Sequence, residues 1–144
     1  MEISCKSEYA LLALLELASH YNGGEPLQIR QIAAEQHIPD RYLEQLLATL
    51  RRGGIVKSQR GAKGGYILAR EPWKISLLEV MGCLEGLNPT PEEEATPKTL
   101  ETGVIQEIWH EARQAADLVL QNYTLQDLCD RQSARKQVNL MYYI

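Results

Sequence analysis

The sequence predicts a mainly α-helical protein with one small β-hairpin, in which a helical domain is followed by a long helix. Three observations support this fold class. The 144 residues are 44% hydrophobic, which is enough for one buried core. Apolar residues recur at helical spacing over residues 6–52 and again over 97–122. Two short β-capable runs lie between these stretches, on either side of a glycine-rich loop.

The first predicted helix covers residues 6–20. Tyr9 and the leucines at positions 11, 12, 14, 15 and 17 cover more than half of its circumference. A helix that is apolar over so much of its surface is expected at the centre of a domain. Asn22 and the two glycines after it end this helix.

Two further helices are predicted on either side of a short break. Residues 27–36 form the first, and residues 40–52 form the second, in which leucines keep the i, i+3, i+4, i+7 spacing from Leu43 onward. Between them lies His37-Ile-Pro39, after which Asp40 is expected to cap the next helix. This order is the outline of a helix-turn-helix.

A hairpin is predicted directly after the third helix. The pair Gly53-Gly54 ends that helix, and residues 55–58 and 66–69 are two β-capable runs. The loop between them contains three glycines together with Arg60 and Lys63. A hairpin in this place is a wing, here given the bounds 55–70.

The charge distribution agrees with a nucleic-acid partner. The net charge of the chain is -4, but the stretch from Arg41 to Lys74 contains eight basic residues and only two acidic ones, a local net charge of +6. A local basic surface matters more for DNA than the total charge. The third helix also turns polar side chains away from its leucines, as a helix in a major groove requires. A solvated surface, which any outer helix has, is the alternative for this helix face.

A nucleotide pocket would also explain glycines beside cations, but the context does not fit. A P-loop requires G-K-[ST] between a strand and a helix, whereas Lys63 is followed by Gly64. A dinucleotide fingerprint opens a helix, and this loop instead opens the run Tyr66-Ile-Leu68. Arg60 and Lys63 at a hairpin tip are placed to meet phosphates or a narrow minor groove, unless the loop is simply a turn.

Three ordered motifs resemble one known family. They are Tyr42-Leu-Glu-Gln-Leu-Leu, Leu50-Arg-Arg-Gly-Gly-Ile-Val and Arg60-Gly-Ala-Lys-Gly-Gly-Tyr. The chain is similar to the Rrf-type family of bacterial winged helix-turn-helix transcription regulators, which includes IscR-, NsrR- and CymR-like proteins. The match is close over residues 1–85 and looser beyond.

The resemblance implies a homodimeric regulator, of the repressor type, that binds double-stranded DNA. The third helix would read the major groove, and the wing would contact the minor groove or backbone. In the family the residues matching Glu44 and Arg60 bear on sequence recognition, and Glu can accept a hydrogen bond from cytosine N4. The candidate DNA contacts are Gln28, Arg41, Tyr42, Glu44, Gln45, Thr49, Arg51, Arg60, Lys63 and Gly64.

The second half of the chain has the pattern of a dimerisation helix. Thr96 is expected to cap it, with Pro97 at its first position, and Asn122 is its last residue, giving a length of about 39 Å at ~1.5 Å per residue. A helix that long overhangs one small domain, so we expect its apolar stripe to pack on a second copy, with intramolecular packing as the alternative. The candidate interface residues are Leu100, Val104, Ile108, Trp109, Ala112 and Val119.

The sensing site of the family does not carry over. Cluster-binding members place three cysteines before the long helix, whereas residues 86–97 here contain none. No metal site is therefore assigned, and no cofactor is predicted. An iron-sulfur cluster stays possible, with Cys5 and Glu8 as candidate ligands, since Glu8 stands where a carboxylate ligates the cluster in some members. A cluster held by Cys5, Cys83 or Cys129 in a dimer interface is the form left open. Cys83 and Cys129 are interpreted as small core residues.

The sequence therefore predicts a winged helix-turn-helix domain at 1–85, a linker at 86–96 and a dimerisation helix with a C-terminal segment at 97–144. No catalytic motif is present, so an enzyme is not expected. The absence of a signal peptide and of a long apolar run predicts a cytoplasmic protein without membrane association. The signal implied by the family is redox, iron-sulfur or sulfur status, with a protein effector as one route. The alternative function is a winged-helix module that docks on a partner enzyme.

Overall fold

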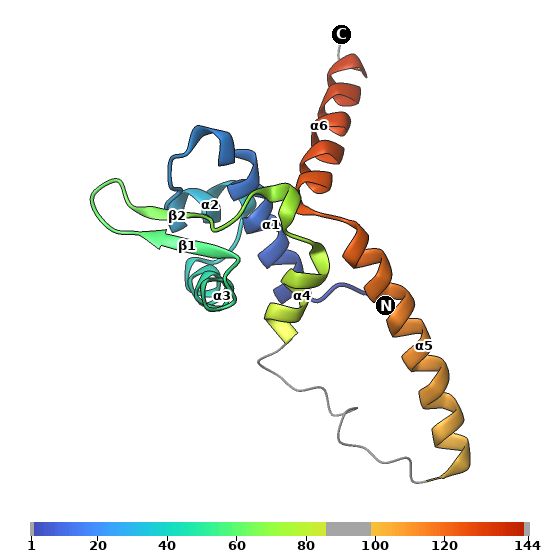
Figure 1. Cartoon of the computed structure of the whole chain (residues 1–144). Helices are drawn as coiled ribbons and strands as arrows, with labels where there is room; N and C mark the ends of the chain where they lie inside the picture. Colours follow the sequence, from blue (N-terminus) through green and yellow to red (C-terminus); the bar gives the residue numbers. More distant parts are fainter. Residues whose placement is uncertain (1, 86–98, 143–144) are drawn as a thin grey trace.

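The protein is described here by a computed structural model, which covers residues 2–85 and 99–142. It is mainly helical with one antiparallel hairpin, so the predicted fold class is confirmed (Figure 1). Across those two ranges, no helix is long and apolar enough to cross a membrane. The elements in order are α1 (Cys5–Ser19), η1 (Tyr21–Gly23), α2 (Ile29–Gln36), α3 (Asp40–Arg52), β1 (Val56–Gln59), β2 (Gly65–Leu68), η2 (Pro72–Lys74), α4 (Leu77–Glu85), α5 (Leu100–Asn122) and α6 (Leu125–Tyr142).

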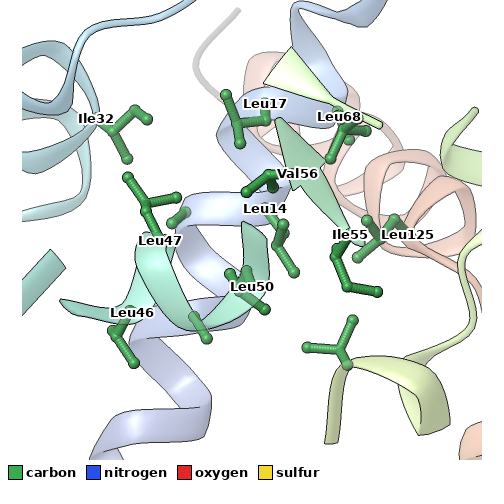
Figure 2. Close-up of a cluster of buried hydrophobic side chains, with 14 of the residues drawn as sticks. Leu14, Leu17, Ile32, Leu46, Leu47, Leu50, Ile55, Val56, Leu68 and Leu125 are labelled. Carbon is green, nitrogen blue, oxygen red and sulfur yellow. The ribbon is translucent and has the colours of Figure 1, made fainter. Parts of the chain in front are cut away.

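The predicted central position of α1 is confirmed. Helices α2, α3, α4 and α6 and strand β2 all pack against it. Leu14 and Leu17 of α1 lie beside the inner leucines of α3 and beside Leu68 of β2 (Figure 2). Burying these side chains removes apolar surface from water, at roughly 25 cal/mol per Å², and this is the main favourable term in folding.

The turn between α2 and α3 differs from the prediction at one residue. Asp40 is the first helical residue of α3, and Pro39 is the N-cap, so Asp40 does not cap the helix. The reason is that the carbonyl of Pro39 already accepts the first helical hydrogen bond, from Leu43 at 3.0 Å. The Asp40 carboxylate still lies in the first turn, where it interacts favourably with the helix dipole.

The hairpin has the predicted position within one residue at each end. Val56 pairs with Leu68 and Gln59 pairs with Gly65 in a simple antiparallel register. Leu27 adds a short third segment to this sheet, because its amide and carbonyl exchange hydrogen bonds of 3.0 and 2.8 Å with Tyr66. The wing is thereby attached to the chain that leads into α2.

Residues 99–142 form two helices rather than one. Helix α5 ends at Asn122 as predicted, but it begins at Leu100 with Thr99 as its N-cap, whose hydroxyl accepts a hydrogen bond from Thr102 at 3.0 Å. The predicted cap Thr96, with Pro97 and the predicted linker 86–96, lies outside the described residues. The helix is about 35 Å long at ~1.5 Å per residue.

Helix α6 was not predicted, and its first turn belongs to the core of the winged domain. Leu125 has an exposed fraction of 0% and lies beside Ile55 (Figure 2). The helix starts with a capping box, because Thr124 and Asp127 each bond the other's backbone amide, at 3.3 and 2.8 Å. Ser76 and Thr124 form an isolated antiparallel bridge, which fixes the junction of α5 and α6 on the domain.

Candidate nucleic-acid interface

Helix α3 turns one polar face outward. Its leucines at positions 43, 46, 47 and 50 are buried, whereas Arg41, Glu44, Gln45 and Arg51 are exposed. The leucines recur at helical spacing and so share the side of α3 that packs on α1. The polar residues between them therefore point away from α1. Four of the predicted DNA contacts therefore lie on one accessible surface.

Thr49 was expected on this face, and that expectation is wrong. Its exposed fraction is 8%, and its hydroxyl donates to the Gln45 carbonyl at 3.1 Å and accepts from Arg52 at 3.3 Å. Helix α4 covers this edge of α3, since the thiol of Cys83 donates to the Thr49 carbonyl at 3.4 Å. Both polar groups of Thr49 are thus used inside the protein.

Tyr42 has a mixed position. Its ring is half-buried and meets the ring of Tyr9 edge-to-face, with centroids 5.5 Å apart. Such aromatic pairs stabilise packing by about 0.5–1.5 kcal/mol beyond area burial. Tyr42 therefore anchors α3 to α1 while part of its surface stays accessible beside Arg41.

The tip of the wing presents the two predicted cations. Arg60 and Lys63 are both exposed in the loop between β1 and β2. Gly64, also a predicted contact, has a different task there: its amide donates to the Gly61 carbonyl at 2.9 Å, and a side chain on it would collide with the backbone of Gln59. This close approach makes the loop narrow and holds the cations at its end.

Helix α3 and the wing lie on the same side of the molecule, while α5 and α6 lie on the other side (Figure 1). The backbone joins α3 and the hairpin tightly, because the Ile55 amide donates to the Leu50 carbonyl at 3.0 Å. Arg51 adds a side-chain link, donating to the hydroxyl of Ser58 on β1 at 3.4 Å. Ser58 was missed by the sequence reasoning, since nothing in its local pattern distinguishes it from other strand residues.

The remaining predicted contact, Gln28, is exposed at the N-cap of α2. Its backbone amide donates to the side chain of Gln31 at 2.9 Å, which satisfies one of the free amides at the start of the helix. Gln28 is next to Leu27, whose backbone is bound to the wing. The start of α2, α3 and the wing are therefore connected parts of one domain.

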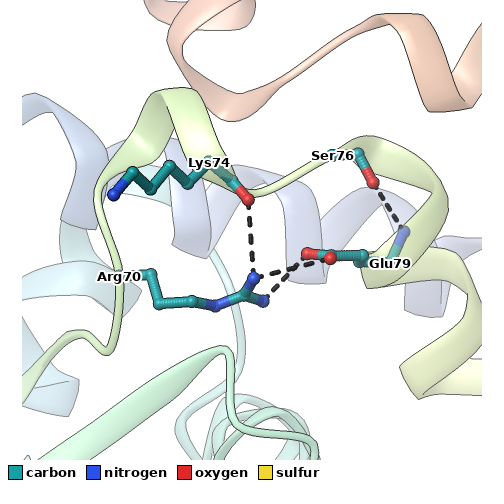
Figure 3. A network of polar contacts seen from close by, with 4 residues as sticks. All are labelled: Arg70, Lys74, Ser76 and Glu79. Atoms are coloured by element: carbon teal, nitrogen blue, oxygen red, sulfur yellow. Dashed lines mark hydrogen bonds and ion pairs between the residues drawn. The ribbon is translucent and has the colours of Figure 1, made fainter.

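The base of the wing is fixed to α4 by a polar network. Arg70, just after β2, binds the carboxylate of Glu79 at 2.8 and 3.5 Å and the Lys74 carbonyl at 3.5 Å (Figure 3). Ser76 completes the network by accepting a hydrogen bond from the Glu79 amide at 3.2 Å. A bidentate Arg–carboxylate pair has a fixed geometry, so it restricts the angle between hairpin and α4.

The cations that face outward keep their charge available. Within residues 2–85 and 99–142, the ion pairs involve Glu16, Glu71 and Glu79, and none includes Arg41, Arg60 or Lys63. A cation that neutralises a DNA phosphate releases the counterions condensed on the DNA, and this release favours binding. This surface can therefore attract DNA even though the chain is acidic overall.

Helix α5 presents a long apolar surface. None of its side chains is buried within the described chain, and exposed fractions reach 82% at Leu100 and 69% at Trp109. The other four predicted interface residues, Val104, Ile108, Ala112 and Val119, are exposed as well. Large contiguous apolar patches of this kind mark interaction sites in soluble proteins. We call this surface the α5 face.

The thiols do not converge on one site. Cys5 is exposed at the start of α1, Cys83 packs between α4 and α3, and Cys129 is half-buried on α6 beside Ser19. Burial raises the pKa of both the Cys83 and the Cys129 thiol. Among the described residues, no three His, Cys, Asp or Glu side chains are grouped as metal ligands. Within the described part of a single chain, these donors do not form the grouped thiolate site that an iron-sulfur cluster uses.

Comparison with known proteins identifies the family to which this chain is similar. Residues 3–131 match the model of the Rrf2 family, described as iron-dependent transcriptional regulators. CymR of Bacillus subtilis, an HTH-type transcriptional regulator, is 36% identical over 145 residues, covering 99% of each chain. Among solved structures, IscR of T. potens superposes with a TM-score of 0.76 at 36% identity, over 92% of this chain and 88% of that one. The structure of CymR, titled the global cysteine regulator of B. subtilis, gives 0.75 at 36% identity, over 91% and 98%.

Proposed function

Because this chain belongs to the Rrf2 family of DNA-binding transcription regulators, we propose that it is a homodimeric repressor that reads a specific operator. Helix α3 enters the major groove, and the wing contacts the adjacent minor groove or phosphate backbone. Arg41, Glu44 and Gln45 reach base edges. Arg51, Arg60 and Lys63 meet phosphates, and Thr49 is left out because its polar groups are already bonded.

The observation that best supports this proposal is the position of the unpaired cations. Arg60 and Lys63 lie exposed at the end of a narrow loop that is attached to α3, the helix whose polar face is outward. A winged-helix module that only docks on a protein does not require cations at a glycine-rich tip. The alternative function therefore explains less of the surface.

The wing can be tested by removing both cations. In the variant Arg60→Ala/Lys63→Ala, we expect weaker binding to a duplex selected from a random-sequence library. The slope of log affinity against log salt should flatten by about one unit per lost phosphate contact. Fluorescence anisotropy over a range of salt concentrations measures both quantities.

A matched control removes two cations elsewhere. Arg135→Ala/Lys136→Ala makes the same change in net charge at two exposed positions of α6. If this control lowers the salt slope as much as the wing variant does, the effect belongs to total charge, and the wing is not a DNA contact.

Dimerisation through the α5 face is the second part of the proposal. Two copies that pack these stripes together remove large apolar side chains from water, and obligate dimer interfaces are apolar in this way. A dimer also presents two copies of α3, as binding to a palindromic operator requires.

We further propose that DNA binding by this chain does not depend on an iron-sulfur cluster. The support is the donor set: the three cysteines lie on α1, α4 and α6, and among the described residues they are not grouped with other metal ligands. Protein purified without oxygen should show no visible absorption band, and an iron chelator should leave its affinity for the selected duplex unchanged. A visible absorption band would contradict this proposal if the chelator removed it and abolished DNA binding at the same time. The signal is then sulfur status, as the name of the cysteine regulator CymR suggests, with a protein effector as a possible carrier.

A further inference from the structure

The C-terminal end of α3 contains a close contact between a sulfur atom and a glycine. Cys83 of α4 points at Gly53, the C-cap of α3, and a β-carbon added to Gly53 would collide with the Cys83 sulfur and lie 3.2 Å from the Cys83 β-carbon. The same thiol donates to the Thr49 carbonyl, which also accepts a hydrogen bond from the Gly53 amide at 3.1 Å. One side chain of α4 thus touches the last turn of α3 at two points.

Gly53 is a glycine for steric rather than conformational reasons. Its φ of -79° and ψ of -1° are accessible to any residue, so its backbone does not require glycine. Its neighbour Gly54 differs, with a φ of 76° and no atom within 4 Å of an added β-carbon. At position 54 the backbone requires glycine, whereas at position 53 the sulfur does.

The contact lies between the proposed DNA-reading helix α3 and the α5 face. Helix α4 packs against α3 on one side and against α5 on another. Its C-terminal end is held by Lys6, whose ammonium group donates to the Leu84 carbonyl at 3.3 Å. Because α4 is fixed by α1 and touches both other helices, a displacement at Cys83 changes where α3 stands relative to α5.

We propose that Cys83 is a positioning residue for DNA recognition, which sets the place of α3 relative to α4 and α5 by fitting its sulfur against Gly53. This inference rests on the proposed reading of DNA by α3. Cys83 is only partly buried and Gly53 is exposed, so the contact acts through direct van der Waals packing and through the bond of the thiol to the Thr49 carbonyl. A side chain too large for this contact moves α3 as a body, and contacts to base edges, which carry the sequence information, suffer more than contacts to phosphates.

A double-substitution cycle tests the contact. Gly53→Ala should lower affinity for the selected duplex roughly tenfold, because overpacking displaces α3. Cys83→Ala alone should lower this affinity about threefold, because the last turn of α3 loses the sulfur that packs against Gly53. Gly53→Ala/Cys83→Ala should return to that range, because the new methyl takes up space left by the sulfur. Affinity for a duplex of scrambled sequence should change little throughout. The ratio of the two affinities separates positioning from loss of fold.

Two glycines nearby provide controls. Gly82→Ala, on an open part of α4, should bind like the unchanged protein. Gly54→Ala should lose stability through its backbone conformation, and Cys83→Ala should not restore it. If Gly53→Ala does not fold, folding restored by Cys83→Ala supports the contact, and Cys83→Val then tests overpacking from the other side. Equal binding by Gly53→Ala and the unchanged protein, or no recovery in the double variant, overturns the inference. Failure of the unchanged protein to select any duplex would instead reject the proposed function.

Discussion

The winged domain and the C-terminal helices use their apolar side chains in different ways. From α1 to α4, leucines and isoleucines pack on one another, and helix α1 is covered on several sides. Helix α5 buries no side chain, and α6 buries only Leu125 among its described residues. The first region therefore buries its apolar side chains within a single chain, whereas the second leaves them exposed, as the proposed dimer requires. Substitutions of the same chemical type should then have different effects in the two regions.

The largest effect on stability is expected at Leu125, where the first turn of α6 packs into the core of the winged domain. Leu125→Ala should lower the free energy of unfolding by about 3 kcal/mol, because it removes a fully buried side chain and leaves a cavity. Leu140 of the same helix has an exposed fraction of 64%, and Leu140→Ala should change stability by less than about 0.5 kcal/mol. Urea unfolding followed by circular dichroism measures both. Similar losses for the two variants would contradict the difference in burial.

A smaller effect, of another kind, is expected on the α5 face. Ile108→Asp should weaken dimerisation by about 2 kcal/mol or more, since it places a charge in an apolar interface. The winged domain should keep its fold because Ile108 is exposed in the single chain. Light scattering after size-exclusion chromatography gives the oligomeric state. Gln114→Asp adds the same charge at an exposed polar position of α5, and a dimer lost equally in this control would exclude the α5 face as the interface.

The smallest effect compares two helix caps. Thr124→Ala removes the cap of α6, which is bonded to the core, and should lower the free energy of unfolding by about 1 kcal/mol. Thr99→Ala removes the equivalent cap of α5, whose first turn is exposed, and should fray that turn with little change in global stability. Hydrogen exchange of the amides after each cap distinguishes the two outcomes. A global loss in Thr99→Ala would mean that α5 unfolds together with the domain.

Much of the fold could be predicted because local patterns determine it. Leucine spacing placed α1 and α3 within one residue, and the glycines on either side of the hairpin located the wing. Thr49 was misplaced because it lies at the edge of the leucine stripe, and only its contact with α4 decides its burial. Helix α6 was missed because its apolar residues are not strongly one-sided, although the pair Thr124 and Asp127 was a readable capping signal.

The candidate site was predictable to a different extent. The exposed cations and the polar face of α3 follow from helical spacing and a glycine-rich loop, which are properties of neighbouring residues. The links Arg51 to Ser58 and Cys83 to Gly53 join elements that are separate in sequence. Such contacts depend on how helices and strands pack, so no local pattern indicates them.

The bridge between Ser76 and Thr124 gives the chain an evolutionary freedom. Two hydrogen bonds, from the Leu77 amide to the Tyr123 carbonyl and from the Leu125 amide to the Ile75 carbonyl, hold the start of α4 beside the junction of α5 and α6. The entropy of closing a flexible loop rises only with the logarithm of its length. Residues can therefore be inserted or deleted between α4 and α5 at little cost to the winged domain. A change of length there can then arise in evolution without loss of the winged fold.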